Sequence, residues 1–224
     1  MAALTSKQTS GLTSTEVNGL TSTNIQALST SALAGVTSAV MGALTSTALN
    51  ALTTAQVAVL STSQLDALSA TQFGGLTTTN LAAVATAKLT SAQLGALTST
   101  TLNALSTTQV SALTNREVAG LSAGELNTMS STNIQALTTT ALSGLGTTAL
   151  AGATTTALGY MTSTQLGALT TNQVEGLTTA QLTTIATTTK MPAYQTASMV
   201  MLTVISTLSP ACMILLAMRP AKSF

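Results

Sequence analysis

The sequence lacks most of the residues on which protein chemistry depends. Among its 224 residues there is no His and no Trp, aromatic residues make up 2%, and charged residues make up 5%. General acid–base catalysis and metal binding draw on His, Asp, Glu and Cys, of which the chain has five acids and one Cys. We therefore expect a protein that is not an enzyme, with no catalytic residue, no metal or cofactor site and no small-molecule substrate.

The scarcity of charge and of cysteine excludes further classes of function. Six basic residues and a net charge of +1 are too few to neutralise a run of phosphates, so we expect no nucleic-acid partner. Cys212 is the single cysteine and cannot close a disulfide within the chain. Residues 1–10 carry one Lys and no apolar run, so no secretory signal peptide is seen there. Composition alone leaves the compartment unknown.

What the chain has in abundance is a repeat of eight residues. An apolar residue recurs every eight positions from Leu4 to Val84, segment 84–88 supplies five residues in place of eight, and the spacing resumes from Leu89 to Ile185. We divide the chain into a first octapeptide block at 1–84, an irregular segment at 85–88 that shifts the phase, a second block at 89–189 and a tail at 190–224.

Each octad, numbered from that apolar residue, follows one pattern. Position 2 is Thr or Ser, positions 3 and 4 are mostly small and polar, position 5 is most often Gln or Glu, position 6 is aliphatic, and position 8 is mostly Ala or Gly. One unbroken helix is excluded, because eight residues rotate its apolar stripe by about 80°. A flat strand fits poorly, because it places positions 1 and 6 on opposite faces.

A short helix in every octad accounts for the pattern. The hydroxyl at position 2 suits an N-cap for the amide of position 5, whose Gln or Glu side chain reaches back to the cap amide and completes a capping box. Positions 1 and 6 form a hydrophobic staple, and a small residue at position 8, such as Gly35 or Gly120, lets the chain turn into the next octad. We predict an all-α solenoid of short capped helices, one per octad, with Leu, Val, Ile and Ala inside and Thr, Ser, Asn and Gln outside.

A β-solenoid stays open as the alternative fold. Runs of three hydroxyl residues recur in register, for example at 13–15, 21–23 and 45–47, and Thr favours strands. The Gln, Leu and Ala content and the capping boxes favour the helical solenoid.

The tail differs in composition from the repeat. Met199 to Met218 is a stretch of 20 residues without charge, which matches the length of a bilayer span. Arg219 and Lys222 follow it, as after a membrane anchor, whereas Pro210 and the nearby hydroxyls lower its hydropathy. Two interpretations stay open: membrane contact through Met199 to Met218, or an apolar cap on the end of the solenoid.

The acids have structural explanations. Glu16, Glu117 and Glu125 occupy position 5, the slot of the capping box, and Asp66 and Glu175 occupy position 7, where we expect contact with solvent.

Three other features contain residue types that occur in functional sites. Glu117 and Glu125 are one octad apart, and Arg116 beside them is expected to ease their repulsion and not to form a site. Cys212 has no His partner in the chain, so we expect a buried apolar role for it. Gly74-Gly75 ends an octad and is not a phosphate loop.

The octads at 161–168, 169–176 and 177–182 read Met-Thr-Ser-Thr-Gln-Leu-Gly-Ala, Leu-Thr-Thr-Asn-Gln-Val-Glu-Gly and Leu-Thr-Thr-Ala-Gln-Leu. They resemble the Leu-Thr-Thr-x-Gln-Val-x-Ala octapeptide arrays of large bacterial proteins with unassigned or presumed cell-surface function. The resemblance covers nearly all of the chain before the tail. It implies a bacterial origin, a structural role and a cell-surface or extracellular location, and it carries no functional residues.

The function expected from these observations is structural. A rod-like spacer or filament module would present rows of Thr and Ser and self-associate through the solenoid ends. The alternative is a binding surface on which aligned Thr rows contact glycan, mineral or ice.

Overall fold

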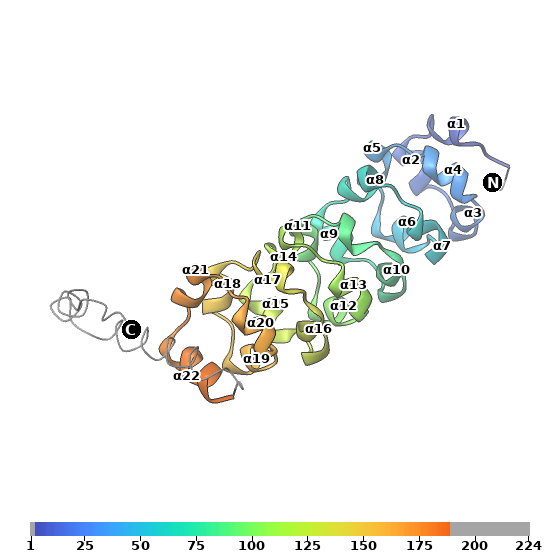
Figure 1. The fold of residues 1–224 in the computed structure, drawn as a ribbon. Helices are drawn as coiled ribbons and strands as arrows, with labels where there is room; N and C mark the ends of the chain where they lie inside the picture. Colours follow the sequence, from blue (N-terminus) through green and yellow to red (C-terminus); the bar gives the residue numbers. More distant parts are fainter. Residues whose placement is uncertain (1–2, 189–224) are drawn as a thin grey trace, which may run out of the picture.

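The computed structural model describes residues 3–188, which form an elongated stack of short helices (Figure 1). The α-helices are Ser6–Thr9 (α1), Ser14–Asn18 (α2), Ser22–Gln26 (α3), Thr30–Gly35 (α4), Ser38–Gly42 (α5), Ser46–Asn50 (α6), Thr54–Ala58 (α7), Thr62–Asp66 (α8), Ala70–Gly74 (α9), Thr78–Ala83 (α10), Ser91–Leu94 (α11), Ser99–Asn103 (α12), Thr107–Ser111 (α13), Asn115–Val118 (α14), Ala123–Thr128 (α15), Ser131–Ala136 (α16), Thr139–Leu142 (α17), Thr147–Ala151 (α18), Thr155–Gly159 (α19), Ser163–Gly167 (α20), Thr171–Glu175 (α21) and Thr179–Thr188 (α22), and one 3-10 turn, Thr86–Lys88 (η1), lies between α10 and α11. Residues 3–188 contain no strand, so the prediction of an all-α solenoid is confirmed and the β-solenoid alternative is wrong for this part of the chain.

The helices begin where the octad pattern predicts. At α7 the Thr53 hydroxyl accepts the backbone N–H of Gln56 at 3.2 Å, and Gln56 Oε1 accepts the N–H of Thr53 at 2.8 Å. The same complete capping box begins α1, α2, α8, α9, α11, α13, α14, α15, α20 and α21. Two otherwise unpaired groups of each short helix are thereby satisfied within the octad.

We call each octad a unit and name it by its helix. Units three apart along the chain pack against each other, as α1 does on α4, α5 on α8, α14 on α17 and α19 on α22. The turn η1 counts as a unit, because it packs on α8 before it and on α13 after it. Segment 84–88 therefore fills the place of a complete octad although it has five residues.

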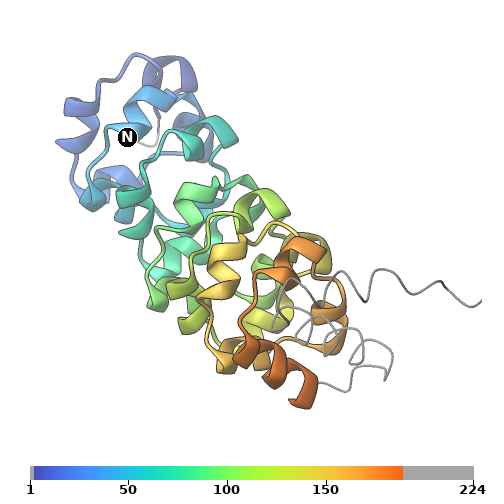
Figure 2. The same ribbon diagram turned by 90° about the vertical axis from the view of Figure 1, so that its left-hand side faces the viewer.

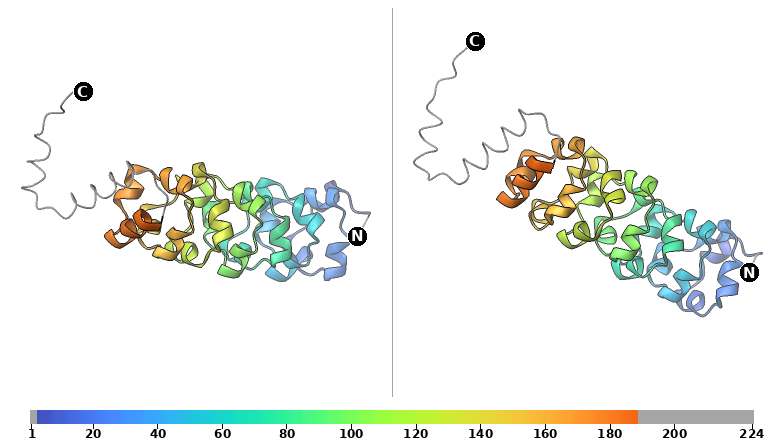
Figure 3. Two further views of the ribbon diagram at one scale, coloured as in Figure 1. Left: turned by 60° about the horizontal axis from the view of Figure 1, so that its bottom comes forward. Right: turned by 90° about the horizontal axis from the view of Figure 1, so that it is seen from below.

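The units wind around one long axis. Helices from distant parts of the repeat follow one another from the N-terminal end to α22 without folding back (Figures 2 and 3). Positions 1 and 6 of successive units form a continuous apolar column inside the winding, in which Leu94, Leu142 and Leu150 have no exposed surface. Isolated helices of this length are marginal in water, so burial of these side chains, worth about 1.5 to 3 kcal/mol each, must stabilise them.

Glycine at position 8 serves the contact between turns. A methyl group at Gly35 would lie 2.1 Å from the carbonyl oxygen of Ser6, which is position 3 of the unit three before. No glycine among the described residues has a positive φ, so the backbone angles at position 8 do not require glycine. At Gly35, Gly120 and Gly144, glycine is required because a side chain would push two backbones apart.

Candidate functional surface

The glutamines at position 5 join successive turns. Gln56 Nε2 donates to the carbonyl oxygens of Ile25 and Leu28, both at 2.8 Å. Ile25 is at position 6 of the α3 unit, four units back, and Leu28 is at position 1 of the α4 unit, three units back. Each glutamine thus lies against the junction of two earlier units, and one superhelical turn takes between three and four units.

The same bridge recurs along the solenoid. In each case one amide nitrogen donates to a carbonyl near the end of a helix four units back and to the position 1 carbonyl of the unit after it. The bridging glutamines are Gln56, Gln64, Gln72, Gln93, Gln109, Gln165, Gln173 and Gln181.

The burial of these side chains corrects the sequence prediction. Glutamine was expected on the outside, yet Gln56 and Gln173 are 2% exposed and Gln64 is 4% exposed. A buried primary amide needs partners for its oxygen and its nitrogen, because an unpaired buried polar group costs about 1 to 3 kcal/mol. The cap amide and the two carbonyls supply them.

The short segment at 84–88 leaves this bridging pattern unchanged. Gln173 reaches carbonyls 31 and 28 residues back, whereas Gln93, whose bridge spans the short segment, reaches Leu65 and Leu68, 28 and 25 residues back. The difference of three equals the number of missing residues. Lys88 stands at position 5 of the short unit, and its Nζ donates to the carbonyl of Leu60 at 3.2 Å, as a glutamine would.

Asparagines at position 7 form a second set of bridges, directed forward along the chain. Asn127 Nδ2 donates to the carbonyl of Gly152 at 3.2 Å, and its Oδ1 accepts the cap N–H of Thr154 at 2.6 Å. Equivalent pairs of bonds are made by Asn18, Asn50 and Asn103.

The N-cap amides that donate to a side chain do so either to the position 5 side chain of their own unit or to an asparagine of an earlier turn. The asparagines bind the cap amides of α6, α10, α16 and α19, and none of these helices has a capping box. Position 5 in these four units is Ala or Asn, which leaves the cap amide without an acceptor in its own unit. An asparagine from an earlier turn supplies that acceptor.

The acids at position 5 are held by their own caps. Glu16 Oε2 accepts the backbone N–H of Thr13 at 2.7 Å and its hydroxyl at 2.8 Å. These hydrogen bonds, the one from the backbone first, lower the pKa of the Glu16 carboxyl, because they favour its charged form. The side chain therefore stabilises the start of α2.

Glu117 and Glu125 do not form a common site in the structure. Each carboxylate accepts the cap N–H of its own helix, from Thr114 at 2.8 Å and from Ser122 at 2.7 Å. Glu117 is buried, Glu125 is half-buried, and the Arg116 side chain is exposed. Within residues 3–188 no ion pair joins Arg116 to either acid, and the expectation that Arg116 eases their repulsion stays a prediction.

Some of the remaining sequence candidates lie within the described residues and some lie outside them. Asp66 and Glu175 are exposed, and Gly74 ends α9, where a methyl group would lie 2.6 Å from the Ala96 carbonyl oxygen. Across the described part of the chain, no three potential metal-ligating side chains gather.

The tail candidates are not placed by the structure: Cys212 and the stretch Met199 to Met218 lie outside the described residues. None of the helices that are described combines the length and apolar composition needed to cross a bilayer.

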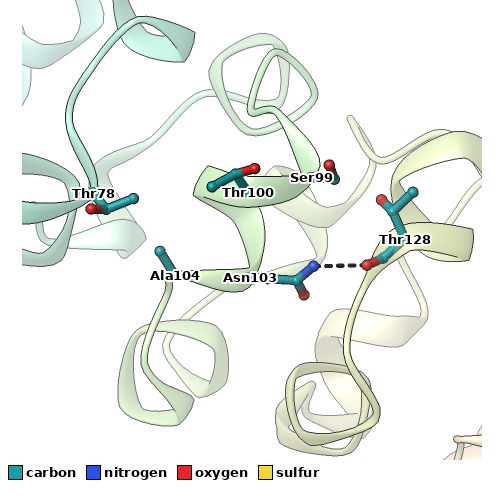
Figure 4. A pocket seen from close by; sticks show the side chains of 6 residues that line it. All are labelled: Thr78, Ser99, Thr100, Asn103, Ala104 and Thr128. Atoms are coloured by element: carbon teal, nitrogen blue, oxygen red, sulfur yellow. Dashed lines mark hydrogen bonds between the residues drawn. The ribbon is translucent and has the colours of Figure 1, made fainter.

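Side chains that carry hydroxyl groups border an open groove on the outer surface. The groove, of about 620 Å³, lies between α10, α12 and α15 and is bordered by Thr78, Ser99, Thr100, Asn103, Ala104 and Thr128. Figure 4 shows Asn103 reaching across to the backbone of Thr128, a bridge of 2.7 Å between two turns. The groove therefore follows the boundary between successive turns, and its walls carry no charge.

The comparisons with known proteins identify the repeat over part of the chain. Residues 86–123 match the ALTTAQ repeat family. This match starts within the short unit and ends at the first residue of α15. The six letters of the family name are also the residues at 51–56. No curated protein and no solved structure matches the chain. The chain is thus a tandem-repeat protein whose units are short helices.

Proposed function

We propose that this chain is a non-catalytic structural repeat protein, a rod-like spacer or surface module that presents rows of Thr and Ser. The observation that carries the proposal is the continuous apolar column from Val17 to Ile185, to which every turn contributes only near-neighbour contacts. In such a solenoid each added unit lengthens the particle and leaves its width unchanged. Length is the property that a spacer supplies.

The outer surface supports the same proposal. Positions 3 and 4 of most units are exposed Ser, Thr or Ala, and the chain has five acids and six bases in 224 residues. An uncharged hydroxyl surface stays hydrated without attracting charged partners. The acids at position 5 cap their own helices, which is a structural role and fits a non-catalytic protein.

Small-angle X-ray scattering of the full chain and of a variant lacking residues 129–160, four complete units, tests the proposal. The deletion should shorten the largest dimension of the particle and leave its cross-section unchanged, because whole octads keep the bridges three and four units apart in phase. A scattering curve typical of a compact sphere, or a deletion that changes the cross-section, would contradict a spacer.

The hydroxyl-lined groove supports a second candidate, a surface that binds glycan, mineral or ice. Successive units point to different sides of the solenoid, so the hydroxyl rows are spread around it, which favours glycan in a groove over a flat ice plane. An ice-recrystallisation assay with the full chain should show no inhibition. Strong inhibition would favour the ice-binding alternative over the spacer.

A further inference from the structure

The faces that successive turns present to each other are not alike. Beyond the first turn, every position 8 glycine for which the surroundings are described has position 3 of the unit three before as its neighbour in the preceding turn. The pairs are Gly35 with Ser6, Gly75 with Ser46, Gly120 with Ser91, Gly144 with Asn115, Gly152 with Ala123 and Gly176 with Thr147. One face of a turn, which we call the donor face, thus carries the glycines and the amide donors of the bridging glutamines. The other carries the position 3 residues, the carbonyls that accept from those glutamines, and the asparagines that donate forward.

The first turn, residues 4–27 with α1, α2 and α3, carries the donor face without an occupant. Gly11 and Gly19 stand at position 8, yet a methyl group on either would meet only the backbone of its own helix, at 3.7 Å from Gln8 and 3.3 Å from Thr15. Gln8 at position 5 is exposed, whereas later glutamines in the same slot are buried or half-buried.

The apolar residues of the first turn show the same incomplete burial. Leu4, Leu12 and Leu20 at position 1 are half-exposed, whereas Leu28 and Val36, at the same position in the next two units, are 4% and 3% exposed. The first turn therefore exposes apolar, glycine and amide groups of the kinds that later turns bury against their predecessors.

We propose that the first turn binds the last turn, residues 161–185 with α20, α21 and α22, of a second copy of this chain. The complement of the donor face is already known from the molecule itself: it is the face that each turn offers to the next. In the last turn that face carries Ser163 and Thr171 at position 3, and both side chains are exposed. The proposed contact continues the interface that joins the turns inside one chain.

The arrangement must be head to tail. Two first turns brought together would oppose donors with donors, because both carry the glycines and the amide of Gln8 and neither carries the carbonyl row. A head-to-tail contact is heterologous and leaves a free face at each end, so copies add without a fixed limit. The product is a series of lengthening rods.

The contact is expected to be weak. Gln8 Oε1 already accepts the N–H of Thr5 at 2.9 Å, which leaves its nitrogen for a carbonyl of the second copy. Glu16 has no hydrogen to donate, and Asn24 is shorter than glutamine. Assembly should therefore depend on concentration. The proposal rests on the spacer role only because both require a stable solenoid. A chain that stays a rigid monomer would contradict the proposed association and would leave the spacer role unaffected.

Sedimentation velocity of the full chain over a range of concentrations tests the proposal. The wild type should form species heavier than a monomer as concentration rises. The double variant Gly11→Glu/Gly19→Glu should weaken association at least 10-fold, because two charged side chains would occupy the face. Its monomer should fold normally, since Gly19 has ordinary helical angles, φ −79° and ψ −10°, and no atom of another unit is near either glycine.

The control carries the same added charge away from the ends. Thr79→Glu/Thr140→Glu places two acids at exposed position 4 sites in the middle of the solenoid, and it should associate like the wild type. Circular dichroism melting curves of the variants establish that each is folded.

A mixing experiment distinguishes head-to-tail from other contacts. Ser163→Glu/Thr171→Glu blocks the opposite face and should also be monomeric. Mixed in equal amounts, the two blocked variants should give a dimer of one copy of each and nothing larger, since one good face of each kind remains. A wild type that is monomeric at every concentration, a closed dimer, or association that survives Gly11→Glu/Gly19→Glu, as assembly through residues 199–218 would, overturns the proposal.

Discussion

The units of α17 and α21 close the same interface between turns in two different ways. At α17, position 5 is Ala141, and the backbones meet so closely that a methyl group at Gly144 would lie 1.9 Å from the Asn115 carbonyl oxygen. At α21, Gln173 bridges the turns, and a methyl group at Gly176 would lie 3.3 Å from the nearest atom, Cβ of Thr147. A bridging amide therefore replaces backbone contact with hydrogen bonds and holds the turns apart.

The same division holds elsewhere in the solenoid. A methyl group at Gly35, in a unit with Ala at position 5, would lie 2.1 Å from the Ser6 carbonyl oxygen. One at Gly75, in a unit with the bridging Gln72, would lie 3.6 Å from Ser46 Oγ. The unit of α14 separates bridging from side-chain size as the cause. Glu117 fills position 5 but has no N–H to donate, and a methyl group at Gly120 would lie 1.8 Å from the Ser91 carbonyl oxygen. Bridging, and not side-chain size, separates the two classes.

The largest effect is expected from adding a methyl group where the turns are closest. Gly144→Ala should lower the free energy of unfolding by about 3 kcal/mol, because the added carbon and the Asn115 carbonyl cannot both keep their places. Gly75→Ala, at the same octad position in a bridged unit, should change it by less than about 1 kcal/mol. Urea unfolding of both variants, with hydrogen exchange to locate the loss, measures the contrast. Equal effects would show that the two interfaces are alike.

The second effect comes from the bridge itself. Gln173→Glu keeps an acceptor for the Thr170 cap amide but removes both hydrogen bonds to Leu142 and Leu145 and sets a carboxylate oxygen beside their carbonyls. We expect a loss of about 2 to 3 kcal/mol at pH 7. The protonated acid can donate to one carbonyl, so the folded state should favour the neutral form.

The sign of the pH dependence follows. A carboxyl whose pKa is raised on folding stabilises the protein below its unfolded value of about 4.3, and that stability is lost as the pH rises through the folded pKa. The deficit of Gln173→Glu relative to wild type should thus be smaller at pH 4 than at pH 7 in urea unfolding. Gln8→Glu, at the exposed first turn, is the matched control and should cost little at either pH. A deficit independent of pH would mean that the carboxyl does not face the carbonyls.

The local part of this architecture was predictable from the sequence and the part between turns was not. Caps and staples lie within one octad, so Thr53, Gln56 and Val57 predict their own helix. The partners of Gln56 at Ile25 and Leu28 depend on the number of units per turn, which is set by packing. One indication was present: glutamine outnumbers glutamate at position 5, although an acid would serve a capping box equally well, and only the amide has hydrogens to donate.

The smallest effect tests whether cap amides are shared between units. Asn127→Ala removes the acceptor of the Thr154 N–H and should cost about 1 kcal/mol, because Ala157 cannot accept that bond in its place. Adding Ala157→Gln gives α19 its own capping box and should restore most of the loss, whereas Ala157→Gln alone should gain little, since the amide is already paired. Hydrogen exchange at Thr154 reads the effect directly: fast exchange in Asn127→Ala, slow exchange in the wild type and in the double variant. Slow exchange in all three would mean that another acceptor holds this amide and that the asparagine bridge joins the turns only through its bond to the Gly152 carbonyl.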